Sequence, residues 1–102
     1  MDIDEIQNYI ARQNFKVTDH AFEEMKADHL TFQDIVSGII SGEIVEKYPE
    51  SYPLLACLIN GKTGNGEPIH ICILLPPLVK IITVYRPDSA KWTNDFRKRR
   101  SK

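Results

Sequence analysis

The chain has 102 residues, 42% of them hydrophobic and 26% charged, and a formal net charge of −1. This length suits one folded domain, which can bury a core without disulfides or a metal ion. No apolar stretch approaches the roughly 18 residues that span a membrane, and the acidic start MDIDEIQNYI lacks the basic opening of a secretory signal. We therefore expect a single domain over residues 1–102 in the cytoplasm, without membrane contact and with Cys57 and Cys72 as buried thiols.

The charges are unevenly distributed along the chain. Residues 1–50 hold eleven acidic and four basic residues, whereas residues 51–102 hold three acidic and nine basic ones. Such an asymmetry could orient a nucleic acid on the basic side and a basic partner on the acidic side. The simpler interpretation is that it favours solubility and attraction between the two halves.

The N-terminal half predicts two to three short helices. Isoleucines at helical spacing indicate a first helix that ends near Gln13–Asn14. A short extended piece around Lys16 precedes a second helix, which Thr18 or Asp19 can cap and which runs through Ala27. Its inner side is expected to carry Ala21, Phe22 and Met25.

A third helix is predicted behind Thr31 and Asp34, which have the spacing of a capping box. Gly42 is expected to end this helix in the left-handed conformation. The apolar stripe of the helix consists of Phe32, Ile35, Val36, Ile39 and Ile40.

After Gly42 the apolar period changes from helical to two, and four strands are predicted at residues 43–48, 54–60, 69–75 and 79–86. Short links between consecutive strands favour antiparallel hairpins. Pro87 can start a last helix that places Trp92 and Phe96 at i, i+4. The predicted fold is α+β: two to three N-terminal helices packed on a four-stranded antiparallel meander, with a short C-terminal helix.

The register of the hairpins decides which side chains share a face of this sheet. We expect the last hairpin to pair Leu75 with Val79, and the middle one to place Leu58 opposite Ile69. A shift of one residue would reverse the assignment of faces. In the expected register one face carries His70, Cys72, Val84, Arg86 and Cys57, and the other carries Thr83 and Tyr85.

Two histidines are candidates for acid–base chemistry. His70 lies within an apolar strand and could act near neutral pH, or it could be a half-buried residue with one satisfied hydrogen bond. His20 could share that work, or it could cap or pack the second helix. In a catalytic arrangement Arg86 would bind phosphate and Tyr85 would orient or stack a base.

Cofactor and metal sites are not indicated. His70, Cys72 and Cys57 could supply three zinc ligands, but the paired spacing of zinc motifs is missing. The Gly61–Gly66 segment does not join a strand to a helix as a phosphate-binding loop does. We therefore expect no metal and no cofactor.

The basic tail, residues 97–102, could bind the phosphates of a nucleic acid, or it could be a solvated, frayed terminus. Trp92, Phe96 and Tyr85 could stack on unpaired bases, or they could pack in the core. The residues expected to contact nucleic acid are Arg86, Arg97, Lys98, Arg99 and Arg100.

The order of motifs over about residues 15–100 resembles a prokaryotic family catalogued as domain of unknown function 4258. His20–Met25 resembles its H-A-x-x-R-M opening, and Ile35–Glu46 followed by Tyr48-Pro49 resembles its I-x-x-A-I-x-x-G-x-I-I-E-x-Y-P core. Pro68–His70 and Ile81–Asp88 match its P-L-H-V and I-I-T-V-Y-x-P-D stretches. That family looks distantly similar to small toxin ribonucleases of toxin–antitoxin pairs, which implies RNA or an antitoxin-like protein as partner.

The second helix departs from the family pattern. The family usually reads R-M-x-E-R-G where this chain has Glu24 to His29, so Glu24 and Asp28 replace two arginines. A ribonuclease needs cations around the phosphate, and acids there would repel RNA. The expected function is therefore a non-catalytic interaction module that binds a protein or a nucleic acid. The alternative is a toxin-like, metal-independent ribonuclease that uses His20 and His70 as acid and base and Arg86 to bind phosphate.

Overall fold

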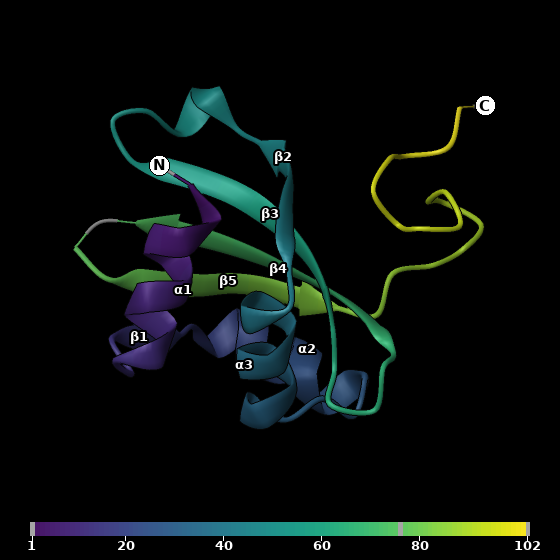
Figure 1. The fold of residues 1–102 in the computed structure, drawn as a ribbon, viewed down its shortest axis with the longest axis horizontal. Helices are drawn as coiled ribbons and strands as arrows, with labels where there is room; N and C mark the ends of the chain where they lie inside the picture. The colour runs from purple at the N-terminus through teal and green to yellow at the C-terminus, as the bar shows by residue number, and fades with distance from the viewer. Residues whose placement is uncertain (1, 76, 102) are drawn as a thin grey trace.

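The computed structural model describes residues 2–75 and 77–101, in which three helices cover one face of a five-stranded mixed sheet (Figure 1). The strand order is β1-β5-β4-β3-β2, with β1 parallel to β5 and all other neighbours antiparallel. The elements are α1 (Ile3–Ala11), β1 (Phe15–Val17), α2 (Asp19–Ala27), α3 (Phe32–Ile40), β2 (Glu43–Lys47), a 3₁₀ turn η1 (Pro49–Ser51), β3 (Leu55–Lys62), β4 (Pro68–Leu75) and β5 (Val79–Tyr85).

The α+β class and the N-terminal helices are confirmed, but the four-stranded antiparallel meander is wrong. The short extended piece around Lys16 joins the sheet as the edge strand β1, where Phe15 pairs with Val79 and Val17 with Ile81. β1 runs parallel to β5 and forms one edge of the sheet. A strand of three residues is too short for its sequence pattern to predict which strand it pairs with.

Local hydrogen bonds at the helix starts explain why the helices were predicted well. The side chains of Asp2 and Thr18 each accept the amide of the residue three positions further on, at 3.1 Å. Thr31 and Asp34 form the reciprocal capping box, with bonds of 3.1 and 3.0 Å. These contacts satisfy amides that the first turn of a helix leaves without partners.

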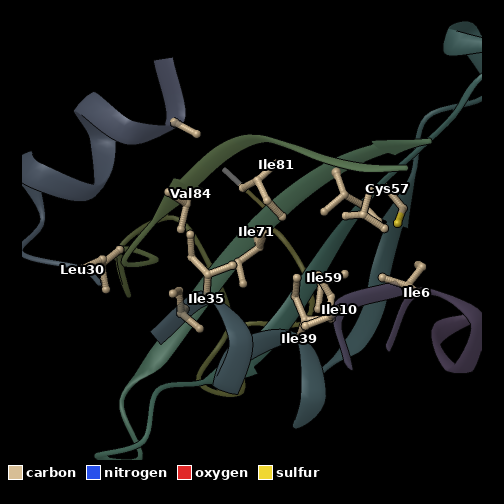
Figure 2. Packing of buried hydrophobic residues seen from close by; sticks show 14 of the residues in the cluster. Ile6, Ile10, Leu30, Ile35, Ile39, Cys57, Ile59, Ile71, Ile81 and Val84 are labelled. Atoms are coloured by element: carbon tan, nitrogen blue, oxygen red, sulfur yellow. The ribbon is translucent and has the colours of Figure 1, made fainter. Parts of the chain in front are cut away.

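The core lies between the three helices and the sheet (Figure 2). Ala21 and Met25 of α2 are buried in it as expected. Phe22 was expected on the same side, but it is 43% exposed and stacks on Phe32, which is 52% exposed. The fully buried aliphatic side chains of the core include Ile6, Ile35, Ile39, Ile59, Ile69, Ile71, Ile73 and Ile81.

Three glycines let α3 lie directly against β3. A Cβ on Gly61 would overlap the carbonyl of Gly38, so the two backbones touch where the helix crosses the strand. The expected left-handed stop at Gly42 is wrong, because the helix ends on Ser41 at φ −88° and Gly42 has no positive φ. Gly42 is required for space instead, since a Cβ there would come within 2.6 Å of Ile59.

A β-bulge in β5 changes which residues share a face of the sheet. Near the turn, Leu74 pairs with Lys80 and Ile73 with Ile81, as the expected register requires. One extra residue, Ile82, then shifts the register, so that Cys72 pairs with Thr83 and His70 with Tyr85. The expected faces are therefore wrong beyond the bulge: Val84 points into the core, and Thr83 and Tyr85 join His70.

The register of the middle hairpin also differs from the expectation. Leu58 pairs with Cys72 rather than Ile69, because the strands run on to Lys62 and Pro68 before the turn. Cys57 is buried on the helical side, and Cys72 is half-buried on the opposite face. The three residues considered as zinc ligands are thus divided between the two faces.

The expected C-terminal helix is wrong. Residues 87–101, here named the C-terminal strap, form turns and an antiparallel bridge between Trp92 and Arg99 (yellow in Figure 1). Phe96 has φ 61°, which a helix cannot contain. The Asp95 carboxylate accepts from the Thr93 hydroxyl at 2.7 Å and the Arg97 amide at 3.1 Å, and such local bonds compete with helix formation.

Substitution of Gly61 by alanine tests the close approach of α3 and β3. We expect Gly61→Ala to lower the free energy of unfolding by about 3 kcal/mol, the upper part of the range for overpacking, because backbone lies in the path of the new Cβ. Gly64→Ala is the matched control, since the nearest atom to its Cβ would be Ser37 Oγ at 3.9 Å. Urea unfolding of both variants gives the comparison, and equal stabilities would contradict the contact.

Candidate functional site

His70 is the centre of a polar and aromatic cluster on the sheet face opposite the helices. The side chain is fully buried. Its Nε2 lies 2.9 Å from the carbonyl oxygen of Phe96, and its Nδ1 lies 3.1 Å from the Tyr85 hydroxyl. Because a carbonyl can only accept, Nε2 carries the proton and Nδ1 accepts from Tyr85. Both ring nitrogens are therefore occupied.

Trp92 of the strap covers this histidine. Its ring meets the His70 ring edge to face, with centroids 4.4 Å apart, and only 3% of Trp92 is exposed. The Arg99 guanidinium lies 4.7 Å from the Trp92 ring centroid on the outside. Arg99 also donates two hydrogen bonds to Glu46 of β2, at 2.8 and 3.1 Å. The Trp92 ring thus covers this part of the sheet, and the Arg99–Glu46 ion pair lies outside the ring.

The electrostatics of the cluster follow from its burial and from Arg99. Burial lowers the pKa of His70, which keeps the imidazole neutral at pH 7. The hydrogen bonds from Arg99 lower the pKa of Glu46, which also accepts from the Tyr48 hydroxyl at 2.7 Å. Burial raises the pKa of Tyr85, and it raises the pKa of the Cys72 thiol to about 11. At pH 7 these shifts favour a neutral His70, an ionised Glu46, and protonated Tyr85 and Cys72 side chains.

The two acids that depart from the family pattern bind the open edge of β5. Glu24 accepts the amide of Val84 at 3.1 Å, and Asp28 accepts the amide of Arg86 at 2.9 Å. Strand β1 pairs with β5 only as far as Ile81, so these amides have no strand beside them. The two acids are four residues apart along the helical segment, and the two amides that they bind are two residues apart along the strand. The segment thereby covers a strand edge that could otherwise pair with another chain.

His20 lies on the exposed surface of α2, away from the contacts of His70. Its Nε2 is 3.4 Å from Glu24, and 71% of its side chain is exposed. Glu24 in turn binds the Val84 amide, whereas His70 binds Tyr85 and Phe96. The structure therefore gives the two histidines no partner in common.

Arg86 is held at the end of β5 by groups on both sides. Its Nε donates to the Asp28 carbonyl at 2.9 Å, and its Nη1 donates to Glu67 at 2.9 Å. About a third of the side chain is exposed. The residue expected to bind phosphate is therefore engaged with carboxylate and carbonyl oxygens.

The arginines of the strap are engaged as well. Arg97 donates to Glu43 at 2.8 Å, and Arg99 donates to Glu46. Arg100 donates to the Ser89 carbonyl and to the Asn94 side chain at 2.8 and 3.0 Å. Lys98 is exposed. Part of the charge asymmetry of the sequence is thus explained by ion pairs between acids of the first half and arginines of the second half.

The structure brings together His70, Tyr85 and Arg99 from the expected site residues, and it leaves His20 and Arg86 outside this cluster. It adds Glu46, Tyr48 and Trp92, which the sequence did not single out as a group. Local alternation did not point to Glu46, because β2 reads Glu-Ile-Val-Glu-Lys and its register shifts between Ile44 and Glu46. The contact between Trp92 and His70 had no local sequence signal either, because it depends on the path of the strap.

The structure offers no sign of a metal site or a membrane span within the residues that it describes. Among residues 2–75 and 77–101, no group of three His, Cys, Asp or Glu side chains lies close enough to hold a metal ion. In the same residues no helix is long and apolar enough to cross a membrane.

The fold and the cluster define a small α+β domain whose sheet carries helices on one face and a strap on the other. Residues 17–86 match the family model described as "Domain of unknown function (DUF4258)", and the chain belongs to this family. The strap follows the matched range. No curated protein matches the chain, and no solved structure matches it.

Removal of the acids on α2 tests their role at the sheet edge. We expect Glu24→Ala and Asp28→Ala each to lower the free energy of unfolding by about 1–2 kcal/mol, because a strand amide loses its charged acceptor. Hydrogen exchange at the Val84 amide should accelerate in Glu24→Ala. Glu23→Ala is the control, since Glu23 is 68% exposed and forms a surface ion pair with Lys26. Unchanged exchange at Val84 would contradict the role.

The buried His70 predicts a pH dependence of stability. Its folded pKa is lowered, so the unfolded chain takes up a proton near pH 6.5 while the folded protein stays neutral. We expect the contribution of His70 to the free energy of unfolding to be constant above about pH 7 and to fall between pH 7 and 5. Glu46, whose folded pKa is lowered, adds its own loss only below about pH 4.5.

Urea unfolding at several pH values measures this dependence. His70→Gln should be less stable by about 1–3 kcal/mol at pH 7, and its stability should vary less between pH 7 and 5. His20→Gln, at an exposed position, is the matched histidine control and should stay close to the wild-type stability at pH 7. A wild-type stability that holds steady or rises as the pH falls would refute a neutral, buried His70.

Proposed function

We propose that this protein is a non-catalytic module that binds a protein partner. The observation that carries the proposal is the state of His70. A general acid or base must reach the proton that it transfers. His70 is fully buried, both of its ring nitrogens are hydrogen-bonded within the chain, and Trp92 covers its face. The histidine therefore acts as an anchor for the strap.

The state of the arginines favours a protein over a nucleic acid as the partner. Binding to nucleic acid depends on cations that are free to neutralise phosphates. Arg86, Arg97 and Arg99 each contact a glutamate of the same chain. Phosphate would have to displace these carboxylates, which reduces the gain from each contact.

A toxin-like ribonuclease is the second candidate, and one observation favours it. Five residues with suitable side chains for acid–base work and phosphate binding gather on one sheet face: Glu46, Tyr48, His70, Tyr85 and Arg99. The resemblance of the family to toxin ribonucleases agrees with this. The cluster could act only if the strap left the sheet, since Phe96 and Trp92 otherwise block His70.

An RNA assay separates the two candidates. The protein is incubated with structured and single-stranded RNAs at low salt with a chelator, beside His70→Ala and Arg99→Ala whose folding is checked by circular dichroism. We expect no cleavage by any of the three, and no saturable RNA binding at about 150 mM salt, because the arginines are paired. Wild-type cleavage that both folded variants lose would replace the proposal with the ribonuclease.

A further inference from the structure

An exposed apolar stripe runs along the outer side of the helical layer. Phe32 and Ile40 of α3 are 52% and 49% exposed, and Phe22 of α2 is 43% exposed. The rings of Phe22 and Phe32 stack with centroids 6.2 Å apart. Phe32, Val36 and Ile40 follow one side of α3 at i, i+4 and i+8. We name these four residues, Phe22, Phe32, Val36 and Ile40, the α2–α3 stripe.

The stripe continues into a groove between α1 and α3. The groove has a volume of about 480 Å³, and its apolar lining includes Ile10, Phe15, Val36 and Ile40. From Phe32 to Ile40 the stripe spans about 12 Å, given a rise of 1.5 Å per helical residue. This length equals about two turns of a facing helix. Exposed aromatic side chains beside a groove are typical of interface anchors.

The layer that carries the stripe is acidic. Residues 2–42 hold eight acidic and three basic residues, a formal charge of −5. Asp19 and Glu23 flank Phe22 on α2, and both are exposed. Lys26 lies over the Phe22 ring, but it is paired with Glu23 at 3.1 Å. All three bases of this layer, Arg12, Lys16 and Lys26, are exposed. Of its eight acids, Glu24, Asp28 and Asp34 are half-buried and the other five are exposed.

We infer that the α2–α3 stripe is the docking surface of the proposed module, and that its occupant is a basic amphipathic helix of a partner protein. The inference rests on the proposed function and names the chemistry of the partner. Leucine-like side chains at i, i+4 and i+8 would cover the Phe22–Phe32 pair and enter the groove beside Ile40. Lysine or arginine residues along their border would face the acidic layer, which gives orientation and speeds association.

A synthetic 18-residue helix of leucine and lysine at amphipathic spacing is the probe. Titration into the ¹⁵N-labelled protein should shift the amide resonances of α2 and α3 and leave those of the strap in place. A peptide with glutamate in place of lysine should bind at least tenfold more weakly. The double variant Phe22→Ser, Phe32→Ser should weaken lysine-peptide binding at least tenfold. Both positions are more than 40% exposed, so its circular dichroism spectrum should match that of the wild type.

Tyr52→Ser combined with Leu54→Ser is the matched control, since these apolar residues are also exposed but lie beyond η1. This variant should bind the lysine peptide as tightly as the wild type. Equal binding of both peptides, shifts confined to the strap or η1, or absence of binding would overturn the inference. So would a concentration-dependent dimer that Phe22→Ser, Phe32→Ser abolishes, because a second copy would then occupy the stripe. RNA cleavage by the wild type would refute the proposed non-catalytic function. It would not bear on the docking surface, which the peptide titration tests separately.

Discussion

The buried imidazole of His70 ties the C-terminal strap to the sheet. The other links between them include the ion pairs Arg97–Glu43 and Arg99–Glu46, whose arginines are more than half exposed. Exposed pairs of this kind contribute about 0–1 kcal/mol each and weaken with salt. The hydrogen bond from His70 to the Phe96 carbonyl lies instead under Trp92, where loss of a partner would leave a buried polar group unsatisfied. The path of the strap therefore depends mainly on this histidine and the ring above it.

The same arrangement relates the charge pattern of the chain to its proposed function. Acids of the first half of the chain bind the arginines of the strap at Glu43 and Glu46, and they bind the open edge of β5 at Glu24 and Asp28. The strap thereby covers the part of the sheet face around His70, and the acids of the α2 segment cover the free edge of β5. The helical layer keeps an excess of negative charge around exposed aromatic side chains. The proposed docking surface therefore lies on the helical side, opposite the cluster around His70.

The sequence predicts those parts of the fold that depend on neighbours in the chain. The helix caps at Thr18 and Thr31 and the cores of all four long strands follow from local spacing. The faces of the last hairpin do not, because one bulged residue, Ile82, reverses every side chain beyond it. The site was predicted only in part, since Glu46 and Trp92 reach His70 through contacts distant in sequence. Glu24 and Asp28 were recognised as unusual, but their role at the β5 edge appears only in three dimensions.

The protonation state of the His70 ring tests the central claim most directly. Long-range ¹H–¹⁵N spectra of the ¹⁵N-labelled protein distinguish a protonated from a bare ring nitrogen and follow the ring through a pH titration. We expect a neutral ring at pH 7 with the proton on Nε2, and a titration midpoint below the ordinary value of about 6.5. A ring that titrates at or above that value, or a proton on Nδ1 at pH 7, would mean that the strap does not hold His70 and that the sheet face is open for chemistry.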